Sequence, residues 1–181
     1  MIVSVTNAQH QTPVDMTAMT RLARRAIRRL RIRTRGTLAI TFIDDRRMRA
    51  LNKRFKRHDW VTDVLSFRYD GSPTTCLRPP KAGRPARRRP HSIWMQPPAA
   101  RQVVGEILIA PRQAKAYARH QGVAYRQELS RYVVHGLLHW LGHDDRTNIQ
   151  QRTMRIREDR LLAQCRRKLP ITKSQSPKNH R

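Results

Sequence analysis

Cysteine is scarce in this chain of 181 residues, and long apolar runs are missing. Cys76 and Cys165 lie far apart and form no CxxC motif, so neither a disulfide framework nor a cysteine zinc site is indicated. No segment approaches the ~20 consecutive apolar residues that a membrane-spanning helix needs. The start of the chain has neither the basic region nor the apolar core of an export signal. We therefore expect a soluble cytoplasmic protein that does not bind membranes.

Acidic residues are also few in this chain. The chain has 12 Asp and Glu against 39 Lys and Arg, which gives a formal net charge of +27 and a sequence pI near 11.8. Net charge says nothing about the fold, but this balance favours a polyanionic partner, with nucleic acid ahead of an acidic membrane surface. The ordinary alternative is a basic surface that only faces solvent.

Apolar periodicity predicts one domain, over residues 1–168, in which strands and helices follow one another. With 38% hydrophobic residues, a chain of this length can bury one modest core. Strands are expected at 2–6, 37–43, 62–69 and 103–110, and helices at 16–30, 44–55, 111–120, 125–141 and 148–167. For the last of these helices the expected apolar side consists of Met154, Ile156, Leu161 and Leu162.

Two segments lack this periodicity. Between about 72 and 102 prolines recur, and seven Lys or Arg occur without an acidic residue. Because proline removes a backbone donor and blocks regular strand pairing, we expect a mostly irregular basic insertion here. Residues 169–181 form a polar tail that we expect to be disordered.

The expected helix at 16–30 has two contrasting sides. Apolar residues recur at helical spacing along one side, while arginines fill the other, at Arg21, Arg24, Arg25, Arg28 and Arg29. The apolar side predicts contact with the core. The arginine side is either a solvated face or a dedicated RNA-binding surface.

The stretch HGLLHWLGHDD, residues 135–145, carries the most specific pattern. His135 and His139 lie one helical turn apart on the same face, so their imidazoles can converge on one ion. Gly142 lets the chain turn back, and Asp145 can then complete a three-ligand zinc site that leaves a fourth position for water. His143 is the alternative third ligand, although it lies within the turn itself.

The spacing HxxxHxxGxxD is that of zinc hydrolases. Zinc peptidases of the HExxH kind use a glutamate directly after the first histidine as general base, and this chain has Gly136 at that place. Metal-assisted chemistry on a phosphate needs no such glutamate. The metal site and the net charge together favour hydrolysis of RNA or DNA phosphodiesters over hydrolysis of peptides.

Three blocks of the sequence resemble the YbeY family of metal-dependent endoribonucleases, also known as rRNA maturation factors. They are LNKRFKRHDWVTDVLSF at 51–67, GEILIA at 105–110 and HGLLHWLGHDD at 135–145. The resemblance implies an α+β fold, with a mixed four-stranded sheet packed with helices and a central zinc-binding helix. It also implies one Zn²⁺ ion, cleavage of single-stranded RNA, processing of the 3′ end of small-subunit rRNA, and a part in ribosome quality control.

Two positions depart from the family pattern. The third zinc ligand of the family is a histidine, and the matching residue here is Asp145. A carboxylate in place of a neutral imidazole lowers the positive charge of the site, which should make bound water less acidic and favour harder ions.

The functional arginine of the family's NxxYR segment is matched by Lys56, which keeps the charge but loses the bidentate fork. Lys56 and its neighbour Arg57 are the expected phosphate contacts, the alternative for Lys56 being a solvated helix end.

Four other polar residues each have two interpretations. Thr62, Asp63 and Ser66 lie near the site, or they only cap and pair with backbone. Glu106 is a carboxylate partner for the second nitrogen of a zinc histidine, or it is an exposed strand residue.

The sequence thus leads to one hypothesis and two rivals. The hypothesis is a single-domain zinc endoribonuclease that acts on rRNA or ribosomal particles, with His135, His139 and Asp145 as metal ligands. The first rival is a noncatalytic RNA- or ribosome-binding protein whose metal is structural. The second is a zinc peptidase, which the missing glutamate disfavours. The oligomeric state is not predicted.

Overall fold

The structure, a computed structural model, describes residues 1–69 and 102–166. The strands and helices of this part of the chain are, in order, β1 (Ile2–Asn7), α1 (Met16–Arg29), β2 (Thr37–Phe42), α2 (Asp45–Lys56), β3 (Val64–Arg68), β4 (Val103–Ile109), α3 (Pro111–Gln121), α4 (Tyr125–Trp140) and α5 (Asn148–Arg166). Each strand and helix expected from the sequence is present, and the ends differ by no more than two residues. Residues 72–101 of the predicted insertion and the whole predicted tail lie outside the described residues.

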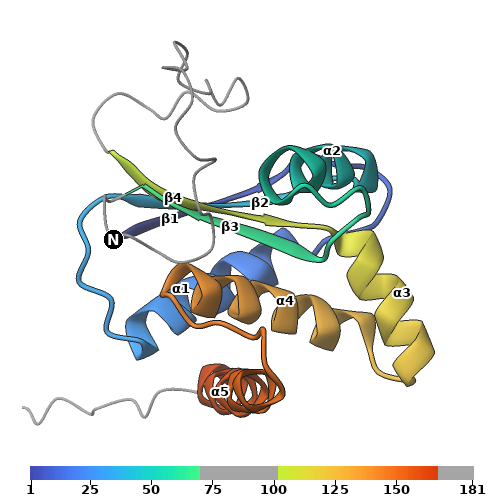
Figure 1. The fold of residues 1–181 in the computed structure, drawn as a ribbon. Helices are drawn as coiled ribbons and strands as arrows, with labels where there is room; N and C mark the ends of the chain where they lie inside the picture. The colour runs from blue at the N-terminus through green and yellow to red at the C-terminus, as the bar shows by residue number, and fades with distance from the viewer. Residues whose placement is uncertain (70–101, 167–181) are drawn as a thin grey trace, which may run out of the picture.

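The strands form a mixed four-stranded sheet in the order β1-β2-β4-β3. β1 pairs with β2 and β2 with β4 in parallel, whereas β3 pairs with β4 antiparallel. Helix α2 covers one face of the sheet, and α1 and α4 lie on the other face with α5 beyond them (Figure 1). This arrangement confirms the α+β class and the mixed sheet that the family resemblance implies.

Side chains of the strands alternate between two cores, because successive residues of a strand point to opposite faces. On β3, Val64 joins the large core shared with α1, α4 and α5, and Leu65 joins the smaller core. That smaller core includes Leu108 of β4 and Met48 of α2. Helix α4 packs against β3, β4 and α5, so it occupies the centre of the large core.

Within the described ranges, no helix combines the length and the apolar character that crossing a membrane requires. Cys165 is buried and not in a disulfide, and Cys76 falls outside the described residues.

Candidate metal centre

Gly136 allows helix α4 to approach the sheet closely. A Cβ atom at this position would lie 2.5 Å from Cγ2 of Ile107 and 3.0 Å from Cγ1 of Val64. The hydroxyl of Ser66 on β3 donates a hydrogen bond to the Gly136 carbonyl at 3.0 Å. The residue directly after His135 therefore faces the sheet, and a side chain at this place has no room to act as the general base of a peptidase.

The end of α4 turns the chain back toward the two histidines. Gly142 adopts a φ of 93°, a conformation in which glycine avoids the strain of a side chain. Its N–H donates to the carbonyl of His139 at 2.9 Å, and the N–H of His143 donates to the carbonyl of Leu138 at 3.1 Å. These hydrogen bonds close the turn that brings Asp145 beside the helix.

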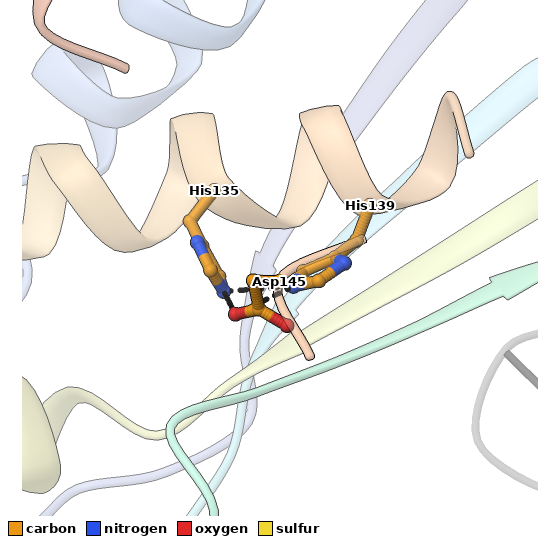
Figure 2. A group of neighbouring side chains, drawn as sticks. All are labelled: His135, His139 and Asp145. Atoms are coloured by element: carbon orange, nitrogen blue, oxygen red, sulfur yellow. Dashed lines mark hydrogen bonds and ion pairs between the residues drawn. The ribbon is translucent and has the colours of Figure 1, made fainter. Parts of the chain in front are cut away.

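His135, His139 and Asp145 form a compact cluster of ligand atoms (Figure 2). The Nε2 atoms of the two imidazoles are 2.9 Å apart, and Oδ2 of Asp145 lies 3.7 Å from the first and 3.6 Å from the second. Donor atoms around a tetrahedral Zn²⁺ ion are about 3.3–3.6 Å apart for bond lengths of about 2.0–2.2 Å. One separation in the cluster lies below this range and the other two lie at or just above its upper end, so the cluster is close to the size of a three-ligand metal site.

The cluster is open on one side. Both imidazole side chains are only 17% exposed, whereas the Asp145 side chain is 38% exposed. The adjacent imidazole of His139 lowers the pKa of the Asp145 carboxyl below its ordinary value. Solvent can reach the group from the aspartate side, where a water molecule or a substrate would enter.

The second nitrogen of each imidazole has its own partner. Nδ1 of His139 lies 2.9 Å from the carbonyl oxygen of His143, and Nδ1 of His135 lies 2.8 Å from Oε1 of Glu158. A carbonyl oxygen and a carboxylate only accept hydrogen bonds, so each Nδ1 is the protonated nitrogen. Each Nε2 then presents its lone pair to the centre of the cluster, as metal ligation requires.

Glu158 is the site residue that the sequence analysis missed. It is 4% exposed on α5, and its other oxygen, Oε2, accepts a hydrogen bond from Nη1 of Arg131 at 3.0 Å. The same Nη1 donates to Asp159 at 2.8 Å. The available signal was a carboxylate at helical spacing between two core residues of α5, Met154 and Leu161.

Glu106 is not the carboxylate partner of a zinc histidine, so that interpretation was wrong. It accepts a hydrogen bond from the Tyr69 hydroxyl at 3.2 Å. Its neighbour on β4, Ile107, points into the core around α4. Because side chains alternate along a strand, Glu106 points to the opposite face of the sheet, away from the imidazoles.

The side chain of His143, the alternative third ligand, contacts Arg157 and is not part of the cluster. Its ring nitrogens Nδ1 and Nε2 lie 2.5 and 2.8 Å from Nη1 of Arg157 on α5. Burial lowers the pKa of His143, and the charge of Arg157 lowers it further. The structure thus brings Asp145, rather than His143, to the two imidazoles.

The two predicted phosphate contacts lie where α2 ends. Lys56 is the last residue of this helix, and Arg57 caps it in the left-handed conformation with a φ of 62°. The positive charge of Lys56 contributes to the lowered pKa of Asp145, after His139 and His135. The charge of Lys56 thus has a minor effect on Asp145, and the side chains of Lys56 and Arg57 are both exposed.

Thr62 and Asp63 make local contacts, whereas Ser66 bonds to the backbone of α4 beside His135. Oδ1 of Asp63 accepts hydrogen bonds from the N–H of Val64 at 2.9 Å and from the hydroxyl of Thr62 at 3.1 Å. Together with the bond from Ser66 to α4, these contacts hold the start of β3 against the helix that carries the histidines.

The fold and the cluster define an α+β protein in which two imidazoles and a carboxylate are grouped as metal-binding side chains are. The sequence profile of the family described as Endoribonuclease YbeY matches residues 4–166. The chain therefore belongs to the YbeY family of endoribonucleases.

Individual relatives agree with this assignment. The Endoribonuclease YbeY of Acidothermus cellulolyticus is 32% identical over 166 residues, which cover 92% of each chain. That of Thermobifida fusca is 30% identical over 169 residues, covering 93% of this chain and 97% of the relative. A solution structure of a Thermotoga maritima protein superposes with a TM-score of 0.52 at 17% identity, covering 91% of this chain and 89% of that one. This last similarity concerns the fold alone.

Proposed function

We propose that this protein is a metal-dependent endoribonuclease in which His135, His139 and Asp145 hold one divalent ion. The observation that carries the proposal is the pair of Nε2 atoms 2.9 Å apart. A neutral imidazole has one N–H, and both rings use theirs at Nδ1. Two lone pairs that face each other at this distance repel, and a cation between them, with Asp145 as third donor, removes the repulsion.

The donor atoms suit Zn²⁺ and could also bind harder divalent ions. Two imidazoles and a carboxylate with an open fourth position are typical of catalytic zinc. A carboxylate is a harder donor than imidazole, so Asp145 widens the choice toward ions such as Mn²⁺. When bound, such an ion supplies a Lewis acid that polarises a phosphate oxygen or lowers the pKa of a water molecule.

The residues around the cluster account for the rest of the proposed chemistry. Lys56, whose charge has a minor effect on Asp145, would attract a phosphate and neutralise part of its charge. Arg57 next to it would add a second cation. Glu158 and the His143 carbonyl would hold the imidazoles in the orientation in which Nε2 binds the ion.

We propose single-stranded RNA as the substrate, and maturation of the small-subunit rRNA 3′ end with ribosome quality control as the biological role. Family membership and the net charge of +27 support an RNA substrate. The rRNA and ribosomal particles are the partners that the family resemblance implies.

Cleavage of a labelled single-stranded RNA tests the proposal. We expect cleavage by protein loaded with Zn²⁺ or Mn²⁺, and none after chelation or in His139→Ala. His143→Ala is the matched control, because this histidine lies outside the cluster, and it should keep both one bound ion and activity. Equal cleavage in all samples would contradict metal dependence. One bound ion without any cleavage would favour the noncatalytic RNA-binding protein.

A further inference from the structure

A strongly basic surface lies on α1 and the segment that follows it. Residues 16–43 contain eight arginines and no acidic residue. The exposed members, which together we call the α1 arginine surface, are Arg21, Arg24, Arg28, Arg29, Arg31, Arg33 and Arg35. The apolar side of α1 is buried in the core as predicted, through Met19, Ala23, Ala26 and Ile27.

The charges of this surface are not neutralised within the described part of the chain. None of the seven arginines forms an ion pair with an acidic residue described by the structure. Three of these arginines on α1, Arg21, Arg24 and Arg28, are spaced three and four residues apart, so they are neighbours on the helix surface. Like charges at this spacing destabilise a helix. Only Arg28 and Arg29 in the last turn gain from the helix dipole, so a bound polyanion would relieve the remaining repulsion.

The composition of the surface indicates which polyanion fits. Residues 16–36 contain no aromatic residue and no histidine. Proteins that hold unpaired bases usually combine a basic groove with aromatic rings on which the bases stack. A surface that offers guanidinium groups alone suits the sugar-phosphate backbone, through which double-helical RNA is mostly recognised.

The α1 arginine surface is separate from the metal cluster but on the same face of the sheet. α1 packs on β1, at the opposite edge of the sheet from β3, whereas α4, which carries the two histidines, packs on β3 and β4 (Figure 1). Nη1 of Arg25 donates to the carbonyl of Cys165 on α5 at 2.9 Å. On α5, Cys165 lies seven residues after Glu158, the partner of His135, and this spacing corresponds to about 10 Å along a helix. One RNA molecule is therefore long enough to contact both the α1 arginine surface and the metal cluster.

We propose that the α1 arginine surface binds the phosphate backbone of double-helical RNA. This goes beyond the proposed cleavage, because the contact is made away from the metal cluster and needs no metal ion. It would hold a paired region of an RNA while an unpaired strand of the same molecule reaches the cluster.

Two variants with the same loss of charge test the proposal. The first changes Arg21, Arg24, Arg28 and Arg29 to Gln, which keeps a good helix former at each exposed position. The control changes Arg46, Arg119, Arg152 and Arg160 to Gln; these are exposed arginines spread over α2, α3 and α5. Circular dichroism checks that both fold. Binding to an RNA duplex of about 16 base pairs is measured by fluorescence anisotropy at several salt concentrations in EDTA.

We expect the first variant to bind the duplex at least about tenfold more weakly, with a salt slope smaller by about two to four, since each lost phosphate contact removes about one. The control should stay within about threefold of the unmodified protein, and so should binding of single-stranded RNA by the first variant. Lys at the same four positions should restore most of the duplex affinity, because a phosphate contact needs the charge.

Two results would overturn the proposal. Equal losses in both variants would mean that only net charge matters, and equal losses for duplex and single strand would mean that the surface does not prefer paired RNA. Because EDTA prevents cleavage during the measurement, the outcome is independent of whether the proposed nuclease activity is correct.

Discussion

Oε1 of Glu158 lies 2.8 Å from Nδ1 of His135, and this contact joins α5 to the histidine face of α4. The carboxylate is buried and is held from its other oxygen by Arg131. His135 is thereby fixed with Nε2 toward His139 and Asp145. The orientation of a ligand on one helix thus depends on a side chain from the next helix.

Glu158→Gln should weaken metal binding about 10–100-fold. The amide keeps the size of the side chain but loses the negative charge that makes the imidazole a stronger donor. Competition with a chromophoric chelator measures the affinity without any RNA. Glu106→Gln is the matched control, because that carboxylate bonds to Tyr69 on the other face of the sheet, and it should bind metal normally. Unchanged affinity in Glu158→Gln would show that the contact does not tune the site.

Asp145→His should raise the preference for Zn²⁺ over Mn²⁺. The change creates the three-histidine set that the family resemblance implies, and imidazole is a softer donor than a carboxylate. Asp145→Ala should lose most affinity for both ions. Titration of each variant with the two metals in turn gives the ratio of affinities, and an unchanged ratio in Asp145→His would argue against direct ligation by residue 145.

Lys56→Ala should lower kcat/KM for RNA cleavage by about 10–100-fold, the size of effect that one lost charged contact to a phosphate produces. Lys56→Arg should keep or raise the activity, because a guanidinium binds phosphate through two donors. Bound metal, measured on the same samples, should not change. If Arg57→Ala is impaired and Lys56→Ala is not, Arg57 is the residue that contacts the phosphate.

Gly136→Ala should destabilise the fold by about 1–3 kcal/mol through overpacking. The added methyl group would lie 2.5 Å from Cγ2 of Ile107, which is buried and cannot move freely. Thermal unfolding should show a Tm lower by several degrees. Gln127→Ala, on an exposed position of the same helix, should change the Tm little. An unaltered Tm in Gly136→Ala would mean that α4 can shift away from the sheet.

The elements of the fold and the clustering of three polar residues could be predicted because their signals are local. Strand alternation, helical periodicity and the spacing of His135, His139 and Asp145 lie within short stretches of sequence. The carboxylate partner could not be found in this way, since it depends on how distant elements pack. Ile156 was expected in the core and is 60% exposed, whereas Glu158, which was passed over, is 4% exposed.

Arg68, the last residue of β3, is the register partner of Gly105 near the start of β4. The polypeptide therefore leaves the sheet and re-enters it at adjacent points, and lengthening a connection between two such points adds only a small entropic cost. The sheet thus tolerates insertions of very different length between these two strands.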